Sequence, residues 1–307
     1  MKWKKGLIPF LVILSTLLFV KTSLARFPRY AVWQITYVFK FPSYTKEVKV
    51  IMPFPPELPE QRLLGFKIFP SNLKTRLVFS SDSSPLLQIS GRGVQTAKVV
   101  FVIKRLLYSP KSERGLPEFK DTPVFLIPNL KEPPLIRKKV YALAKKITTG
   151  KKEELAKVKA LYDFIIGFMH YAHCPSCGDA NLSRILKTRV GNCVDYHSLF
   201  VAMAKALRIP AIFEMGFMLP QSQKSGVVKG YHSWVKVLVH SAGWFPLDIS
   251  EADKHPNLRT FYFGHLQPFR ITLIQGNYKL VKPAIWINEK SFSDVKKLYT
   301  LYFLRLK

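Results

Sequence analysis

The sequence lacks internal repeats, low-complexity tracts and any basic motif interleaved with aromatic residues of the kind that nucleic-acid modules carry. It is also poor in acidic residues: 19 Asp and Glu stand against 48 Lys and Arg, so the formal net charge is +29. Such a charge favours an anionic partner, such as a membrane or cell-envelope surface. A lysine-rich solvated surface is the simpler interpretation, and no specific nucleic-acid partner is predicted.

Hydrophobic residues are abundant, and they exclude a disordered chain. They make up 48% of the 307 residues, and aromatic residues make up 13%. This composition can build sizeable cores, and the length is sufficient for two ordinary domains.

The N-terminus has the pattern of an export signal. Its apolar run from Gly6 to Val20 is 15 residues long, short of the roughly 20 that a spanning helix needs. Three lysines precede this run, and the small residues of "SLA" follow it. Residues 1–25 are therefore predicted to be a signal peptide cleaved after Ala25, with an uncleaved membrane anchor as the alternative. In both cases the body of the protein is exported, to the periplasm or the extracellular space.

Residues 26–108 are predicted to form an all-β sandwich domain. Short runs rich in Val, Ile, Phe and Tyr, such as "YAVWQITYVFKF" and "AKVVFVIKRLLY", are separated by Pro, Ser, Asn and Gly at a spacing typical of sandwiches. No catalytic side chains gather in this region, which favours a structural or docking role. Residues 109–130 have the composition of a linker.

The pattern becomes helical after the linker. "PPLIRKKVYALAKKI" and "KEELAKVKALYDFIIGFMHYA" carry apolar residues at helical spacing, and a core helix is predicted from about Cys193 to Leu207. The strand-like runs "AIFEMGFML", "HSWVKVLVH" and "GWFPLDI" follow. Residues 131–265 are therefore predicted to form an α+β domain, with helices followed by an antiparallel sheet. Residues 266–307 are predicted to be a β-rich extension that either extends this sheet or returns to the sandwich.

Cys193 lies at the point where a loop becomes an apolar helix. A thiol there feels the positive end of the helix dipole, which favours the thiolate. Its backbone N–H has no partner within the helix and can face a developing oxyanion. Gly191 lets the chain turn tightly just before it. Taken alone, the cysteine would be interpreted as a buried core thiol, because free cysteine is among the most buried residue types.

Two further residues make that thiol a candidate nucleophile. His232 opens the strand "HSWVKVLV", and Asp248 ends the strand "GWFPLD". On neighbouring strands of a hairpin, the imidazole can take the thiol proton, and the carboxylate can hold the imidazole in one tautomer. Cys193, His232 and Asp248 are thus the predicted catalytic residues, and the predicted reaction needs no metal or organic cofactor.

The blocks "GNCVDYHSLFVAMAKALRIPA", "GYHSWVKVLV" and "GWFPLDIS" resemble the three signature blocks of the transglutaminase-like superfamily. The resemblance covers roughly residues 151–250 and implies a papain-like Cys-His-Asp domain. Cys193, His232 and Asp248 match the family's nucleophile, base and orienting acid. A weaker likeness of the preceding region implies the β-sandwich found before this domain in some exported bacterial members. The sequence departs from the family's pattern at four positions outside the triad: His197, Arg208, Ile212 and Lys236.

The superfamily includes bacterial peptidases, amide-processing enzymes and protein cross-linkers. The resemblance therefore implies acyl transfer from an amide or peptide bond, with a protein, peptide or envelope polymer as substrate. Hydrolysis is favoured over cross-linking because nothing in the sequence specifies a lysine-binding acceptor site. The alternatives are a protein-glutamine transglutaminase and a non-catalytic envelope-binding protein that retains the fold.

The two other cysteines, in "HYAHCPSC", admit three interpretations. In an exported protein Cys174 and Cys177 favour a short disulfide. With His170 and His173 they also supply four zinc ligands, but four ligands within eight residues must converge without help from a second strand. A redox pair is the third interpretation. Tyr171, in the same stretch, is either a core residue or a second hydrogen-bond donor to an oxyanion.

Overall fold

The computed structural model describes residues 27–110, 125–126 and 132–307. The predicted signal peptide and most of the predicted linker lie outside these residues. Among the described helices, none has the length and apolar character that crossing a membrane requires.

The predicted β-sandwich is confirmed, and it consists of two antiparallel sheets of five strands each. The order in the first sheet is β11 (Ser225–Val227), β17 (Tyr299–Arg305), β1 (Tyr30–Lys40), β6 (Thr96–Leu106) and β3 (Gln61–Phe69). The order in the second is β16 (Lys290–Ser291), β15 (Ala284–Ile287), β2 (Glu47–Pro53), β5 (Pro85–Arg92) and β4 (Lys74–Phe79).

Alternation along the strands explains why these sheets pack together. On β1, Trp33, Ile35 and Tyr37 are fully buried, whereas the residues between them are partly exposed. Their cross-strand neighbours on β6 include Phe101 and Ile103, which are also buried. Successive side chains of a strand point to opposite faces, so one face of β1 and β6 builds the core.

The C-terminal strands are shared between the two halves of the molecule. β14 (Arg270–Gln275) pairs with β10 (Ala211–Met218) in the sheet of the α+β domain. β15 pairs with β2, and β17 pairs with β1. Both options left open by the sequence are therefore realised: the C-terminal chain extends one sheet and then returns to complete the sandwich.

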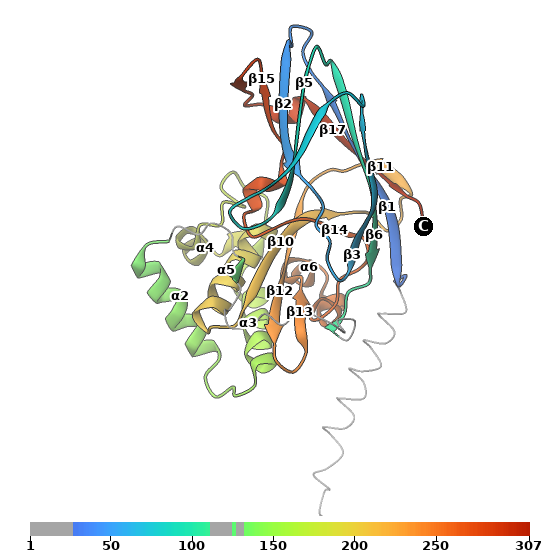
Figure 1. The fold of residues 1–307 in the computed structure, drawn as a ribbon. Helices are drawn as coiled ribbons and strands as arrows, with labels where there is room; N and C mark the ends of the chain where they lie inside the picture. The colour runs from blue at the N-terminus through green and yellow to red at the C-terminus, as the bar shows by residue number, and fades with distance from the viewer. Residues whose placement is uncertain (1–26, 111–124, 127–131) are drawn as a thin grey trace, which may run out of the picture.

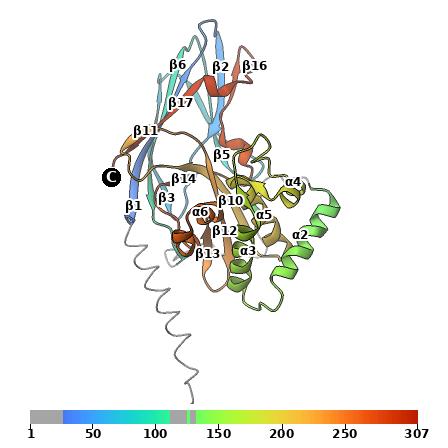
Figure 2. The ribbon, with the colours of Figure 1, turned by 180° about the vertical axis from the view of Figure 1, so that it is seen from behind.

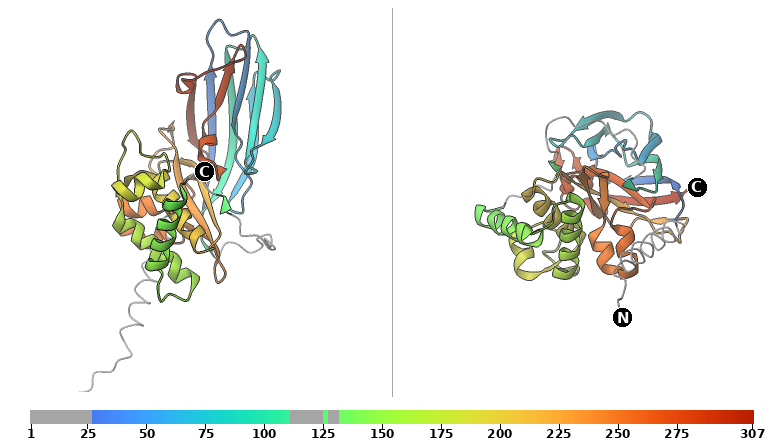
Figure 3. Two further views of the ribbon diagram at one scale, coloured as in Figure 1. Left: turned by 90° about the vertical axis from the view of Figure 1, so that its left-hand side faces the viewer. Right: turned by 90° about the horizontal axis from the view of Figure 1, so that it is seen from below.

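The α+β fold predicted for the second half is confirmed. Its sheet has the order β13 (Gly243–Leu247), β12 (His232–Val239), β10 and β14, with the short β7 (Phe125–Leu126) parallel to β10. The main helices are α2 (Pro134–Ile147), α3 (Glu154–Phe168) and α5 (Cys193–Ala206). Figures 1 and 2 show the sandwich at one end of the molecule and these helices at the other, and in Figure 3 the helices lie to one side of the sheet.

Short elements connect these parts. They are β8 (His170–Tyr171), α4 (Leu182–Thr188), β9 (Val190–Gly191), α6 (Ile249–Lys254) and α7 (Arg259–Tyr262), with the 3-10 turns η2 (Pro256–Leu258), η3 (Tyr278–Val281) and η4 (Val295–Lys297).

A buried ionic cluster joins the sandwich to the sheet of the α+β domain. Glu60 and Arg105 come from the sandwich, and Glu214 and Lys236 come from β10 and β12. The Lys236 ammonium contacts Glu60 and lies 3.2 Å from Glu214, and the Arg105 guanidinium lies 3.3 Å from Glu60. At Lys236 the sequence departs from the pattern of the family that it resembles. The structure gives a reason, because this ammonium neutralises two buried carboxylates.

Candidate active site

The structure places Cys193 at the first residue of α5, held by a capping box. The side-chain oxygen of Asn192, the N-cap residue, accepts a hydrogen bond from the backbone N–H of Val194 at 2.9 Å. In return, the Asp195 carboxylate accepts one from the Asn192 N–H at 3.0 Å. This reciprocal cap fixes the helix N-terminus, and with it the backbone of Cys193.

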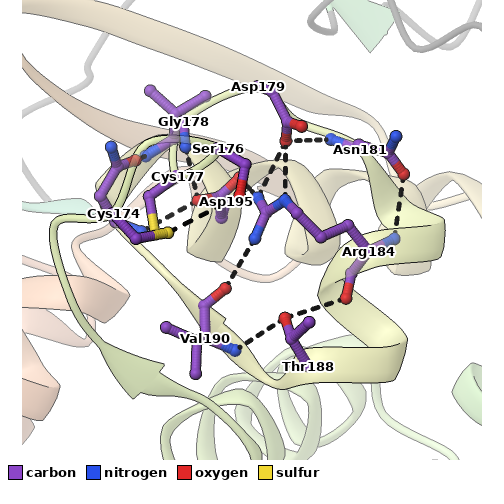
Figure 4. The surroundings of a disulfide bond; sticks show 12 residues. Cys174, Ser176, Cys177, Gly178, Asp179, Asn181, Arg184, Thr188, Val190 and Asp195 are labelled. Atoms are coloured by element: carbon purple, nitrogen blue, oxygen red, sulfur yellow. Dashed lines mark hydrogen bonds and ion pairs between the residues drawn. A yellow bond between two sulfur atoms is a disulfide. The ribbon is translucent and has the colours of Figure 1, made fainter.

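The loop before the helix is tied to the same cap (Figure 4). The predicted disulfide between Cys174 and Cys177 is present. The following Gly178 donates its N–H to Asp195 at 2.7 Å. Arg184 of α4 forms an ion pair with Asp195 at 2.6 Å. The disulfide loop and α4 therefore both stabilise the start of α5 through their contacts with Asp195.

The disulfide also decides between the interpretations of the CxxC pair. Both thiols of the proposed zinc set are consumed by the bond. Within the ranges that the structure covers, no group of three or more His, Cys, Asp and Glu side chains is arranged to hold a metal ion. Cys193 remains the free cysteine and is buried.

Gly191 has a different role from the predicted tight turn. Its φ is not in the left-handed region. A Cβ atom added there would lie 2.5 Å from Cβ of Asp195. The glycine is therefore needed for close packing of the strand β9 against the capping carboxylate.

Tyr171 lies at the edge of the site. β8 pairs in parallel with β9, which sets Tyr171 opposite Gly191, two residues before the cysteine. Its half-buried hydroxyl faces the backbone N–H of Cys193, and burial together with the negative charge of the thiolate raises the pKa of the tyrosine. A protonated phenol beside that N–H can donate a hydrogen bond to an oxyanion formed there.

His232 opens β12 and lies between the thiol and Asp248. Its Nε2 is 2.7 Å from Oδ2 of Asp248, which leaves Nδ1 for the thiol. Burial opposes a charge on the ring, but Asp248 and the Cys193 thiolate together raise the pKa of His232 to about 9. The strand partner of His232 is Gly216, where a Cβ atom would collide with the carbonyl oxygen of Ile271 at 1.8 Å.

The surroundings of Cys193 lower the pKa of its thiol. Burial opposes the thiolate, but the interaction with the His232 ring and hydrogen bonds from Ser233 outweigh it, and the pKa of Cys193 lies below its usual value. The raised imidazole pKa and the lowered thiol pKa both favour a thiolate–imidazolium pair over the neutral thiol and imidazole.

Asp248 is held ionised by several partners. It follows β13 and caps α6, accepting hydrogen bonds from the Glu251 N–H at 3.0 Å and the Ser250 hydroxyl at 3.2 Å. The Arg270 guanidinium donates to Oδ2 at 2.6 Å. Although burial favours the neutral acid, the charges of His232 and Arg270 hold the pKa of Asp248 well below its usual range.

Arg270 was not identified by sequence reasoning. It is fully buried, opens β14, and reaches Asp248 from the C-terminal part of the chain. The only signal in the sequence is an arginine directly before the apolar run "ITLI". Such a position is ordinary at the start of a strand, so its role becomes visible only when β14 pairs with β10.

A second histidine supports the site without carrying charge. His197 lies one turn after Cys193, with Nδ1 3.2 Å from the Ser233 hydroxyl. Its Nε2 accepts the backbone N–H of Ile249 at 3.0 Å. Burial lowers the pKa of His197 to about 3, so the ring stays neutral and fixes α5 to β12 and to the residue after Asp248.

Two other departures from the family pattern have simple explanations. Arg208 has a φ of 60°, in the left-handed region that glycine occupies most easily, which accounts for the usual glycine there. Ile212 is 7% exposed and lies on β10, which is buried on both faces. Neither residue bears on the chemistry of the site.

Comparison with known proteins agrees with this architecture. Residues 141–249 match the family model of the transglutaminase-like superfamily. A stretch of 97 residues is 32% identical to an uncharacterized protein of Haemophilus influenzae, and it covers 25% of this chain and 26% of that protein. The match thus spans about a quarter of that relative.

The resemblance to a solved structure is more extensive. A chain from Cytophaga hutchinsonii described as a "Putative Cysteine Protease" has a similar fold, with a TM-score of 0.60 at 15% identity. The likeness covers 91% of this chain and 92% of that one. At this identity it shows a shared fold, and it extends over the sandwich as well as the α+β domain.

Proposed function

We propose that this chain, in which residues 141–249 form a transglutaminase-like domain, is a cysteine-dependent acyl-transfer enzyme that acts on amide bonds. One arrangement carries the proposal: the thiol of Cys193 faces the ring of His232, whose other nitrogen is 2.7 Å from the buried carboxylate of Asp248. These residues take the roles of nucleophile, acid–base and orienting carboxylate.

In the first half of the reaction the Cys193 thiolate attacks the amide carbonyl carbon. The carbonyl electrons move onto oxygen, where the backbone N–H of Cys193 and the hydroxyl of Tyr171 can stabilise the negative charge. The C–N bond then breaks, the leaving amine takes the proton from the imidazolium of His232, and a thioester remains on the sulfur.

In the second half a water molecule attacks the thioester. The neutral His232 ring accepts a proton from the water, and the C–S bond breaks to give a carboxylic acid and the regenerated thiolate–imidazolium pair. Asp248 keeps the ring in one tautomer throughout. Hydrolysis makes the protein a peptidase or amidase, whereas attack by an amine would make it a cross-linking enzyme.

The proposal includes export. The N-terminal sequence has the lysines, apolar run and small residues of a signal peptide, and a disulfide such as Cys174–Cys177 persists in oxidising compartments. A protein, peptide or envelope polymer outside the cytoplasm is then the substrate. The net charge of +29 suits an anionic membrane or envelope surface as the place where it acts.

A product analysis tests the reaction class. The purified protein and its Cys193→Ala variant are incubated with a library of peptides, with and without a primary amine, and the products are identified by mass spectrometry. We expect new carboxyl termini or deamidated side chains that depend on Cys193, whether or not the amine is present. Preferential incorporation of the amine would instead indicate cross-linking, and products that persist in the alanine variant would contradict the proposal.

A further inference from the structure

The sandwich is open along the side where β3 and β4 lie. Each is the last strand of its sheet, and the short turn 70–73 joins them, so the two edges are neighbours. Among the phenylalanines whose side chains the structure describes, the exposed ones all lie on these two strands: Phe66, Phe69 and Phe79. Large apolar side chains are therefore concentrated on a side of the sandwich that solvent reaches.

Some of these exposed side chains point to the core face of their sheets. Phe66 lies opposite the fully buried Phe101 of β6 and packs on Phe54 with ring centroids 5.3 Å apart, yet it is 46% exposed. Leu77 of β4 lies opposite the buried Leu87 of β5 and is 47% exposed. Directly opposed residues of antiparallel strands share a face. The two sheets thus leave part of their inner faces uncovered along this side.

The strands around the opening carry charges of one sign. β3, β4, β5 and β6 contain no Asp or Glu, whereas each contains at least one Lys or Arg. Lys74 and Arg76 are exposed and point to the outer face of β4, because they alternate with Leu77. Lys67 is exposed next to Phe66 on β3 in the same way. Cations therefore flank the apolar opening on both strands.

An apolar opening flanked by cations fits the surface of a membrane that contains anionic lipids. Apolar side chains enter the boundary between headgroups and acyl chains, and lysine and arginine are attracted to anionic headgroups. A second copy of the chain fits less well, because Lys67, Lys74 and Arg76 of both copies would meet. The β-bulge between Leu63 and Gly65 and the cations on both edges also discourage the addition of a further strand.

We propose that this side of the sandwich docks on a membrane that contains anionic phospholipids. Lys67, Lys74 and Arg76 contact the headgroups. The side chains that enter the membrane form what we call the open edge, which consists of Leu64, Phe66, Phe69, Leu77 and Phe79. The inference goes beyond the proposed function, because docking needs neither the thiol nor a reaction.

Vesicle sedimentation measures the docking. Binding of the protein to phosphatidylcholine vesicles is compared with binding to vesicles of phosphatidylcholine and phosphatidylglycerol in equal parts. We expect binding to the anionic vesicles, and an affinity that falls at least about tenfold in Lys67→Gln/Lys74→Gln/Arg76→Gln and in Leu77→Ser/Phe79→Ser. Circular dichroism checks that the variants are folded. An affinity that both folded variants retain would overturn the proposal.

Control variants carry the same kinds of change on α2, at the other end of the molecule. Lys138→Gln/Lys139→Gln/Lys146→Gln removes three exposed cations, and Leu135→Ser/Tyr141→Ser removes two exposed apolar side chains. The affinity should stay within about twofold in both variants. Losses equal to those at the open edge would assign the binding to the general charge of the protein and overturn a defined surface.

A fluorescent label tests which surface enters the membrane while all the cations are present. In the Cys193→Ala background, Phe79→Cys and Leu135→Cys are each labelled with NBD, whose emission rises in apolar surroundings. The two positions are matched in exposure, at 65% for Phe79 and 62% for Leu135. We expect emission to rise on anionic vesicles for the label at position 79 and to stay unchanged at position 135. No rise at 79, or equal rises at both, would overturn the proposal.

The same label distinguishes a second copy of the chain as the occupant. Emission at position 79 that rises with protein concentration in the absence of vesicles, and does not change when vesicles are added, would assign the open edge to a dimer and overturn membrane docking. Because the labelled protein lacks the thiol of Cys193, failure of docking leaves the proposed reaction intact. Failure of the reaction likewise leaves docking intact.

Discussion

Two buried ionic clusters lie on the same sheet, and they differ in whether their groups can exchange a proton. Around Asp248 are His232 and Arg270, with the thiol beyond the imidazole. Around Glu60 are Arg105 and Lys236, with a further glutamate on β10. Each combines carboxylates with cations away from water. The first contains a histidine and a thiol, which can exchange a proton with each other, whereas the second contains groups that stay charged.

A tryptophan connects the two clusters. Trp234 donates its indole N–H to Glu214 at 2.5 Å. The Arg270 guanidinium lies 5.7 Å from its ring, and the His232 ring centroid is 6.1 Å away. The cluster around Glu60, half of which comes from the sandwich, therefore supports the strand that positions His232. Buried charge is common to both clusters, and the candidate site differs from the other cluster by a pair of groups that can exchange a proton.

The largest functional effect is expected from Asp248→Asn. The amide cannot stabilise the imidazolium and favours the wrong tautomer of His232, so turnover should fall by about 10³–10⁴-fold. The measurement is kcat/KM on whichever peptide the library identifies, with circular dichroism to check folding. Activity within about tenfold of the unaltered protein would show that the two clusters do not differ in the way described.

The largest effect on stability is expected from the other cluster. Lys236→Met leaves Glu60 and Glu214 buried without their ammonium partner, and the free energy of unfolding should fall by about 3–5 kcal/mol. Chemical denaturation measures this, with the exposed Lys138→Met on α2 as the control. A second change, Glu60→Gln, should recover part of the loss. A stability equal to that of the control would show that the cluster does not hold the sandwich to the sheet.

A substitution of Arg270 is expected to have a smaller effect than those at Asp248 and Lys236. Removing its charge in Arg270→Met should reduce turnover about tenfold, because Asp248 keeps its bonds to His232 and to the backbone of α6 but loses one fixed partner. As a positioning residue it should be partly replaced by Arg270→Lys, which retains the charge. Rescue that depends on charge distinguishes this role from simple packing, and a lysine variant as impaired as the methionine variant would argue for packing.

The smallest expected effect concerns the protonation of the two histidines. It is measured by NMR titration of His232 and His197 in the Cys193→Ala variant. His232 should keep a pKa well above 6.5, because Asp248 remains beside it, and His197 should stay neutral from pH 4 to 9. A His232 pKa near 6.5, or titration of His197 in that range, would contradict the assignment.

The two rings also have opposite effects on stability. Because the folded pKa of His232, about 9, exceeds the unfolded value of about 6.5, its charge stabilises the fold fully below about pH 6.5 and loses this effect as pH rises through 9. His197, with a folded pKa of about 3, destabilises the fold as pH falls from about 6.5 to 3.

The sequence is most informative where function depends on local pattern. The alternation in β1, the helical spacing after residue 131 and the three short blocks around the predicted triad are properties of neighbouring residues. The N-cap of α5 is likewise encoded within Gly191 to Asp195.

What the sequence could not provide depends on contacts between distant segments. Arg270 reaches Asp248 only because β14 joins β10, and Lys236 becomes a structural residue only because Glu60 arrives from the sandwich. The division of the C-terminal strands between two sheets is of the same kind, since a strand pattern shows which residues face inward and does not show which edge they join.

The most direct test of the central claim is the rate of Cys193 alkylation by iodoacetamide as a function of pH, in the intact protein and in His232→Ala. Cys174 and Cys177 are followed separately by peptide mapping. The account predicts an apparent thiol pKa well below the usual value of about 8.5, because the imidazolium favours the thiolate, and a return towards that value in the variant. A thiol that titrates near 8.5 in both proteins, or that reacts only after unfolding, would contradict it.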